Sequence, residues 1–233
     1  MHTLEWPAVP AGDWAAAVRA LLRPWLELRI DVQHPPDTLE NELATLEQRL
    51  NTPDDILHGL ERLTPLLPDL IFHYREADGE HYVYVEDPQR RRLAGYTVFN
   101  RLIEIDRRAD RHLRAPHSKY RPEYRRRGIA TAIYGWALAR GFCLLSGARQ
   151  SPGAHALWLR LGRRHPLGFV DLRCKTLRYL GESVEPTVRE DLHTRMLLLG
   201  EGWTLAGLEE RAGLVLEEVV GLRSLGGLLV LRR

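Results

Sequence analysis

The chain has 233 residues, of which 44% are hydrophobic and 27% are charged, as in ordinary soluble globular proteins. This length can bury a sizeable core in one large domain, or in one domain with an appendage. The formal net charge at pH 7 is only +2, so no overall positive field demands nucleic acid as a partner. Nearly all of the positive charge is arginine, which contacts phosphates in a bidentate manner, although a GC-rich coding bias is the simpler cause of the excess.

Neither a disulfide framework nor a metal site is indicated by the sequence. The two cysteines, Cys143 and Cys174, lie in apolar or strand-like settings, and the ten histidines are scattered without ligand spacing. The N-terminus lacks the basic region and apolar core of a signal peptide, and no apolar run approaches the roughly 20 residues that span a bilayer. We therefore expect a cytoplasmic protein with no metal and no membrane association.

The N-terminal part of the chain has a helical pattern. Apolar residues spaced for one helical face predict helices over 13–28, 37–50 and 53–63. Asp13 is a suitable N-cap for the first helix, and Pro24 should bend or divide it. We expect an N-terminal helical segment, residues 1–66, that packs on a main domain of residues 67–233.

The pattern changes to period two after Pro68. Alternating apolar residues predict strands over 70–76, 81–86, 93–105 and 112–121. Asp78-Gly79 lies between the first two runs and is typical of a tight hairpin turn. Gly95 indicates a bulge in the third strand, and the charged residues 106–111 indicate a loop or hairpin tip.

Helices and strands alternate in the second half of the chain. The pattern predicts a helix that begins at Ile129 and is ended by Gly141. It then predicts, in order, strand 142–145, helix 154–163, strand 169–179, a polar excursion over 181–190, strand 192–199, helix 204–219 and an apolar run over 225–231. The chain contains no internal repeat and no low-complexity tract.

The stretch from Tyr120 to Gly141 is the one that most clearly indicates chemistry. A strand leads through a proline turn into three consecutive arginines, Arg125 to Arg127, and then through Gly128 into the helix. Free backbone N–H groups and the aligned peptide dipoles at a helix N-terminus attract anions. Glycine lets a ligand approach the backbone closely. These features predict a site that cradles a pyrophosphate.

The same residues resemble a known family. Arg125-x-x-Gly128-x-Ala130 is similar to the R/Q-x-x-G-x-G/A signature of the GNAT-type N-acetyltransferases, which bind acetyl-coenzyme A, and Pro122-Glu123-Tyr124-Arg125 is similar to the residues that often precede it. The order of elements over roughly 70–200 also resembles that family. The resemblance implies an α/β fold of the α+β type, with a mixed, mostly antiparallel sheet splayed at its centre and flanked by helices. The helices before the first clear strand depart from the family pattern.

The resemblance also implies which residues contact the cofactor. Backbone contacts to the pyrophosphate fall on Arg126, Arg127, Gly128, Ile129, Ala130 and Thr131, with Arg125 opening the signature. The pantetheine arm would lie beside the preceding strand, near Ser118, Lys119 and Tyr120. There it would pair with the backbone as a neighbouring strand does, which constrains side-chain identity only weakly.

The proton donor of the family is in doubt in this chain. The segment from Ser151 to Gly162 is similar to the family's second conserved element, in which a tyrosine often protonates the departing thiolate. Here that position is Trp158, whose indole N–H does not transfer a proton usefully. Core packing explains Trp158 at least as well. The remaining candidates for the acid are Tyr120, Tyr124, Ser151 and water.

Transfer to an amine also needs a general base, since the attacking amine must be neutral. Histidine fits without a pKa shift, and a carboxylate fits when it is partly desolvated. The candidates on segments expected to line the cleft are Glu104, Asp106, His112 and His117, of which Glu104 and His117 are preferred. Side chains alternate along a strand, so His117 and Ser118 cannot both face the cleft without a bulge.

The resulting hypothesis is an N-acyltransferase that moves acetyl from acetyl-coenzyme A directly to a primary amine. The acceptor stays open among a small molecule, a protein and a nucleobase, and the chain is compatible with a homodimer. The alternative is a non-catalytic module of the same fold that binds acyl-coenzyme A or a protein partner. A third interpretation is nucleic-acid binding through Arg90–Arg92 and Arg107–Arg108, but these runs lie at predicted turns and no aromatic residues are interleaved with them.

Overall fold

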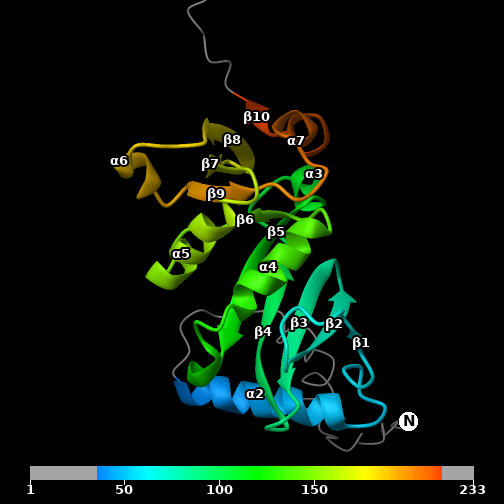
Figure 1. Cartoon of the computed structure of the whole chain (residues 1–233). Helices are drawn as coiled ribbons and strands as arrows, with labels where there is room; N and C mark the ends of the chain where they lie inside the picture. The colour runs from blue at the N-terminus through cyan, green and yellow to red at the C-terminus, as the bar shows by residue number, and fades with distance from the viewer. Residues whose placement is uncertain (1–35, 217–233) are drawn as a thin grey trace, which may run out of the picture. The chain divides into compact units, whose positions relative to one another are not determined.

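Alternating apolar residues build a mixed sheet in the part of the chain that the computed structural model describes, residues 36–216. Its strands are β1 (Glu61–Arg62), β2 (Ile71–Ala77), β3 (Glu80–Asp87), β4 (Arg92–Asn100), β5 (Leu113–Tyr120), β6 (Cys143–Leu145), β7 (Leu167–Arg173), β8 (Thr176–Gly181), β9 (Thr194–Leu198) and β10 (Val215–Leu216). Their order across the sheet is β1-β2-β3-β4-β5-β6-β9-β7-β8-β10 (Figure 1). All neighbouring pairs are antiparallel except β5 with β6 and β8 with β10.

Helices connect and cover the strands. They are α2 (Pro36–Asn51), α3 (Arg107–Asp110), the short 3-10 helix η1 (Pro122–Tyr124), α4 (Ile129–Ala139), α5 (Pro152–Leu161), α6 (Pro186–Arg189) and α7 (Leu205–Ala212). Within the described residues, none of them has the length and apolar character needed to cross a bilayer. Together, the sheet and the helices form the mixed α/β arrangement, of the α+β type, that the sequence predicts.

The chain forms two compact units, Met1–Thr38 and Leu39–Arg233, and the sheet belongs to the second unit. The predicted helix over 13–28 and the predicted apolar run over 225–231 lie outside the described residues. The division into segments 1–66 and 67–233 stays a prediction.

Local turn chemistry places the first strands as predicted. Asp78 and Gly79 join β2 to β3 with φ values of 54° and 76°, the left-handed pair that a tight hairpin requires. The register of β3 and β4 shifts between Val85 and Glu86, which confirms the bulge beside Gly95. Gly95 has φ 154°, and a Cβ there would lie 2.2 Å from the backbone oxygen of Lys119, so only glycine fits between the strands.

The predicted helix over 53–63 is wrong. The segment forms turns followed by β1, and Asp54 and Gly59 have left-handed φ values of 67° and 69°. The Asp55 carboxylate accepts a hydrogen bond from the backbone N–H of Leu57 at 2.8 Å. Such a local bond offers the backbone an alternative to the helix ladder, which explains why turns form here.

The strand predicted over 93–105 ends at Asn100. Beyond it, the backbone N–H of Leu102 donates to the buried carboxylate of Asp110 at 2.8 Å, which draws the chain out of the sheet. The segment 106–111, predicted as a loop or hairpin tip, contains α3. Its N-cap is Asp106, whose carboxylate accepts from the N–H of Arg108 at 2.7 Å.

Two predicted elements of the second half are also wrong in extent. The strand predicted over 169–179 is the hairpin of β7 and β8, which turns at Cys174 and Lys175 with φ values of 50° and 61°. These residue types rarely adopt positive φ, so the sequence carries no turn signal there. The helix predicted over 204–219 ends at Ala212, because Gly213 adopts a left-handed C-cap with φ 68°.

Two apolar cores lie on opposite faces of the sheet. On β6, Leu144 packs into the core formed with α4 and α5, whereas Cys143 and Leu145 pack into the core formed with α3 and α7. This alternation is the period of a strand with both faces buried. Below, the face that carries α4 is called the α4 face, and the other is called the opposite face.

The sheet is splayed at its centre. The parallel strands β5 and β6 pair only at Leu113 with Cys143 and at Arg114 with Leu144. β5 continues along β4 as far as Tyr120, whereas β6 ends at Leu145. From Ala115 to Tyr120, the edge of β5 that faces away from β4 therefore has no partner strand among the described residues. An extended ligand can pair with that edge.

Candidate functional site

A left-handed turn joins the open strand β5 to α4. Arg126 has φ 60°, and Gly128, the N-cap of α4, has φ 82°. The first backbone hydrogen bond of the helix is donated by Ala132 to the oxygen of Gly128 at 2.9 Å. Among the described hydrogen bonds, none has the backbone N–H of any residue from Arg126 to Thr131 as its donor.

This row of N–H groups forms an anion cradle, defined here as the backbone of residues 126–131. The N-cap provides no side-chain hydrogen bond, so nothing within the helix satisfies the first N–H groups. A Cβ built on Gly128 would meet no atom within 4 Å, so the space beside the turn is open. Unpaired N–H groups, the helix dipole and open space together suit a phosphate or pyrophosphate group.

The three arginines of the turn have different surroundings. Arg125 donates from Nε to the backbone oxygen of Tyr120 at 3.0 Å, which ties the turn to the end of β5. The guanidinium of Arg127 lies over the ring of Tyr124, 5.4 Å from its centroid. All three side chains are exposed and add positive charge to the turn that contains the anion cradle.

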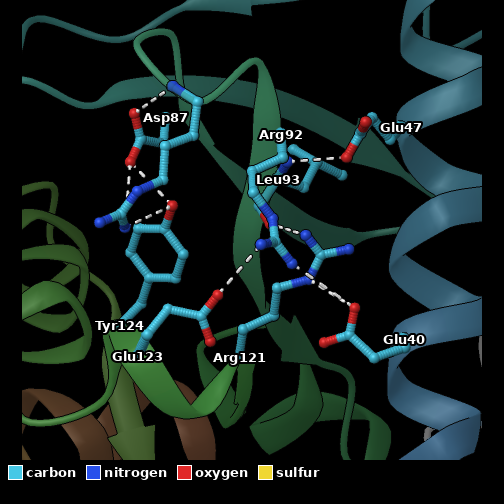
Figure 2. Close-up of polar contacts among 9 residues, drawn as sticks. Glu40, Glu47, Asp87, Arg92, Leu93, Arg121, Glu123 and Tyr124 are labelled. Carbon is cyan, nitrogen blue, oxygen red and sulfur yellow. Dashed lines mark hydrogen bonds and ion pairs between the residues drawn. The ribbon is translucent and has the colours of Figure 1, made fainter.

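Tyr124 anchors the turn to the loop after β3. Its hydroxyl donates to Asp87 at 2.7 Å (Figure 2). Asp87 also accepts from the backbone N–H groups of Gln89 and Arg90 at 3.0 and 3.1 Å. Burial alone would raise the pKa of Asp87, but these hydrogen bonds lower it below its ordinary value. The carboxylate therefore stays ionised and keeps Tyr124 in place.

Arg121 anchors the turn from its other side. Only 4% of Arg121 is exposed, and it donates to the backbone oxygen of Leu93 at 3.0 Å. Its Nε lies 3.1 Å from the Glu40 carboxylate on α2 (Figure 2). Arg92 lies 3.6 Å from the same carboxylate and 3.3 Å from Glu123 in η1. No local pattern in the sequence marks Arg121 or Glu40, since only the fold brings them together.

The side chains of β5 point alternately to the two faces of the sheet. Ser118 and Tyr120 lie on the α4 face, where both hydroxyls hydrogen-bond that of Thr97, at 2.7 and 2.6 Å. Ser118 also donates to the hydroxyl of Tyr134 on α4 at 3.4 Å. Burial raises the pKa of Tyr120, and raises that of Tyr134 to about 12, so both phenols stay protonated.

His117 and Lys119 lie on the opposite face. Lys119 forms an ion pair with Glu42 of α2 at 2.9 Å, and Glu42 also accepts from the hydroxyl of Tyr96 at 2.5 Å. His117 has a buried Nε2 with no hydrogen-bond partner among the described residues. Desolvation, and to a lesser extent the charge of Lys119, lower the pKa of His117 below its ordinary value, while Glu42 acts in the other direction. The lowered pKa favours the neutral form of His117, whose Nε2 is free of partners among the described residues.

The central splay, the left-handed turn and the helix that follows it decide the fold. They agree with the GNAT fold that the resemblance of residues 120–141 implies. The strand order β5-β6-β9-β7, in which the later strand β9 inserts between β6 and β7, completes the mixed sheet.

No family model and no curated protein matches the sequence. Among solved structures, the chain is similar to a GNAT-superfamily phosphinothricin acetyltransferase from Sinorhizobium meliloti in complex with acetyl-CoA. The identity is 25% and the TM-score 0.34, over 53% of this chain and 63% of that one. It is also similar to a chimera that contains spermidine N-acetyltransferase of Vibrio cholerae, at 18% identity and a TM-score of 0.34, over 78% of this chain and 90% of that one.

A third similar structure is a ribosomal-protein alanine acetyltransferase from Vibrio fischeri, at 14% identity and a TM-score of 0.33, over 54% of this chain and 64% of that one. The chain thus spans less than two thirds of the length of the first and third of these proteins.

The remaining predicted site residues lie away from the splay of the sheet or have structural roles. Glu104 follows the end of β4, has a half-exposed carboxylate and lies 3.9 Å from Arg195 of β9. Ser151 is the N-cap of α5, where its hydroxyl accepts from the N–H of Ala154 at 3.2 Å. Trp158 is buried in the core beside Tyr134. These roles leave His117, Ser118, Lys119 and Tyr120 as the predicted residues on the splayed strand.

Proposed function

We propose that this protein is an N-acetyltransferase that transfers acetyl from acetyl-coenzyme A to a primary amine. The observation that carries the proposal is the anion cradle, whose N–H groups lack acceptors among the described residues and lie at the end of a strand with an open edge. A pyrophosphate joined to an extended amide chain matches both features, and coenzyme A has that chemistry. These two features do not determine which molecule carries the acceptor amine.

The residues present fit the cofactor. The backbone of residues 126–131 would bind the pyrophosphate, and the open edge of β5 near Ser118, Lys119 and Tyr120 would pair with the pantetheine amides. When bound, acetyl-coenzyme A supplies the acetyl group as an activated thioester. The clustered arginines of the turn add positive charge where the phosphates would lie.

His117 is the general base of this proposal. Desolvation lowers its pKa, which favours the neutral imidazole, and its Nε2 has no partner among the described residues. A neutral imidazole can take a proton from the ammonium form of the acceptor, which leaves the amine lone pair free to attack. His117 points to the opposite face, so the amine would approach the splay from that side.

Hydroxyl groups on the α4 face would stabilise the leaving thiolate. Tyr120, Ser118 and Tyr134 lie there in one hydrogen-bonded group with Thr97. The raised pKa values of both tyrosines lie above the ordinary thiol value of about 8.5, so the phenols would donate hydrogen bonds rather than surrender their protons. The thiolate would then take its proton from water.

Two measurements test the proposal. Calorimetric titration with coenzyme A should give saturable binding, and incubation of acetyl-coenzyme A with a panel of primary amines should release free thiol in step with acetylated amine. Absence of coenzyme A binding would refute the cofactor assignment. Binding without turnover of any amine would instead support the alternative of a non-catalytic GNAT module, which the buried Trp158 at the usual tyrosine position favours.

A further inference from the structure

A second candidate site lies beside α5 and α6. It is a cavity of about 320 Å³, called here the α5–α6 pocket, between the loop that follows β6, the first turn of α5, and the start of β9. None of its lining residues belongs to β5 or α4. It shares no residue with the anion cradle or with the open strand edge, so its ligand does not depend on the proposed function.

Two buried polar atoms of the pocket residues have no partner among the described residues. They are Oε1 of Gln150, a hydrogen-bond acceptor, and Nε of Arg195, a hydrogen-bond donor. Arg195 is only 6% exposed, its Nη1 already donates to the backbone oxygens of Leu192 and Thr194, and its Nη2 lies 3.9 Å from the carboxylate of Glu104. A buried donor or acceptor without a partner is unfavourable. Each of these atoms would therefore gain from a hydrogen-bond partner that a ligand in the pocket supplies.

The rim of the pocket carries both signs of charge. Arg189 and Glu190 are adjacent at the end of α6, and both are exposed. No ion pair of either side chain is among those of the described residues. The apolar side chains of Phe169 and Met196 also line the pocket. The site thus offers one acceptor and one anion, one donor and one cation, and an apolar wall.

We propose that the α5–α6 pocket binds a small molecule that carries both an ammonium and a carboxylate group, as a free amino acid does. The ammonium would donate to Oε1 of Gln150 and face Glu190. The carboxylate would accept from Nε of Arg195 and face Arg189. An amino-acid side chain would contact the apolar wall. A ligand with only one of the two charged groups would leave one buried atom unpaired, so the pocket should discriminate against it.

The test is direct titration of the full chain, by calorimetry, with the standard amino acids at up to millimolar concentration. At least one of them should bind saturably. Its carboxamide, which lacks the carboxylate, and its N-acetyl derivative, which lacks the ammonium, should each bind about tenfold more weakly or worse, as expected for the loss of a charge-assisted hydrogen bond.

Substitutions test whether the amino acid binds in the α5–α6 pocket. Gln150→Ala and Glu190→Gln should each weaken the affinity for the amino acid, whereas Arg160→Gln, an exposed change on α5 outside the pocket, should leave it unchanged. Arg195 is not substituted in this test, because its hydrogen bonds to Leu192 and Thr194 support β9. Absence of saturable binding by any amino acid, binding of either derivative as tight as that of the parent amino acid, or unaltered affinity in both pocket variants would overturn the proposal. Coenzyme A binding, measured on the same samples, tests the proposed function separately.

Discussion

Replacement of Gly128 by alanine tests whether the anion cradle binds coenzyme A, and the effect on binding can be separated from the effect on stability. Gly128 has φ 82°, a left-handed value that costs an alanine about 1–2 kcal/mol. A Cβ there meets no atom within 4 Å, so no clash adds to that cost. For a chain of this size, we expect Gly128→Ala to lower Tm by about 2–8 °C. The added methyl group would enter the space beside the unpaired N–H groups and weaken coenzyme A binding by about tenfold or more.

The matched control is Gly213→Ala. Gly213 has φ 68°, a Cβ there would likewise meet no atom within 4 Å, and the residue caps α7 rather than α4. The two alanine variants should therefore lose similar stability in a thermal melt, while calorimetry shows weaker coenzyme A binding only for Gly128→Ala. Gly128→Trp, which fills more of the open space, should abolish binding in a folded protein. If both alanine variants bind coenzyme A as tightly as the parent, the backbone of residues 126–131 is not the phosphate site.

Four further changes test other parts of the site. Arg125→Glu with Arg127→Glu should abolish coenzyme A binding in calorimetry, and should also loosen the end of β5 because the Arg125 bond to its last carbonyl is lost. His117→Asn should lower kcat by about 10²-fold or more and remove the fall in kcat/KM at acidic pH, since the base is active only above its lowered pKa. Asp87→Asn should reduce stability at neutral pH and flatten its loss in acid, because a lowered carboxyl pKa gives stability that disappears as pH falls through it. Gly95→Ala should cost about 3 kcal/mol or more in denaturant unfolding, because its Cβ would overlap a β5 carbonyl.

The fold is predictable wherever short-range chemistry determines it. Asp78-Gly79 specifies its hairpin locally, and the helical run after Gly128 specifies α4. Where contacts between residues distant in the sequence determine the structure, no local pattern predicts it. Strand β4 ends at Asn100 because Asp110 binds the backbone just beyond it, and Cys174 with Lys175 form a hairpin turn without a residue that favours positive φ.

The site is predictable in its backbone and less so in its side chains. The pattern from Arg125 to Gly128 indicates the anion cradle, since cradle chemistry depends on backbone geometry and charge that are local in sequence. His117 and Ser118 are placed on opposite faces by the simple alternation of a strand without a bulge. By contrast, Tyr134 contacts Ser118 only through the packing of α4 on the sheet, and no local pattern marks it as part of the site.

Arginine is abundant in this stretch, and burial distinguishes the structural arginine from the others. Arg125, Arg126 and Arg127 form the conspicuous run, yet all are exposed. Arg121 is almost fully buried and is bound to a backbone oxygen of β4 and to Glu40 of α2. A buried guanidinium without its carboxylate is strongly unfavourable, so Glu40 constrains where β5 ends and η1 begins. Because the turn is ordered by these contacts before any ligand arrives, little of the binding free energy needs to be spent on ordering it. It follows that Glu40→Gln, on a helix outside the anion cradle, should weaken coenzyme A binding measured by calorimetry, and an unchanged affinity would show that the turn is ordered by its own residues.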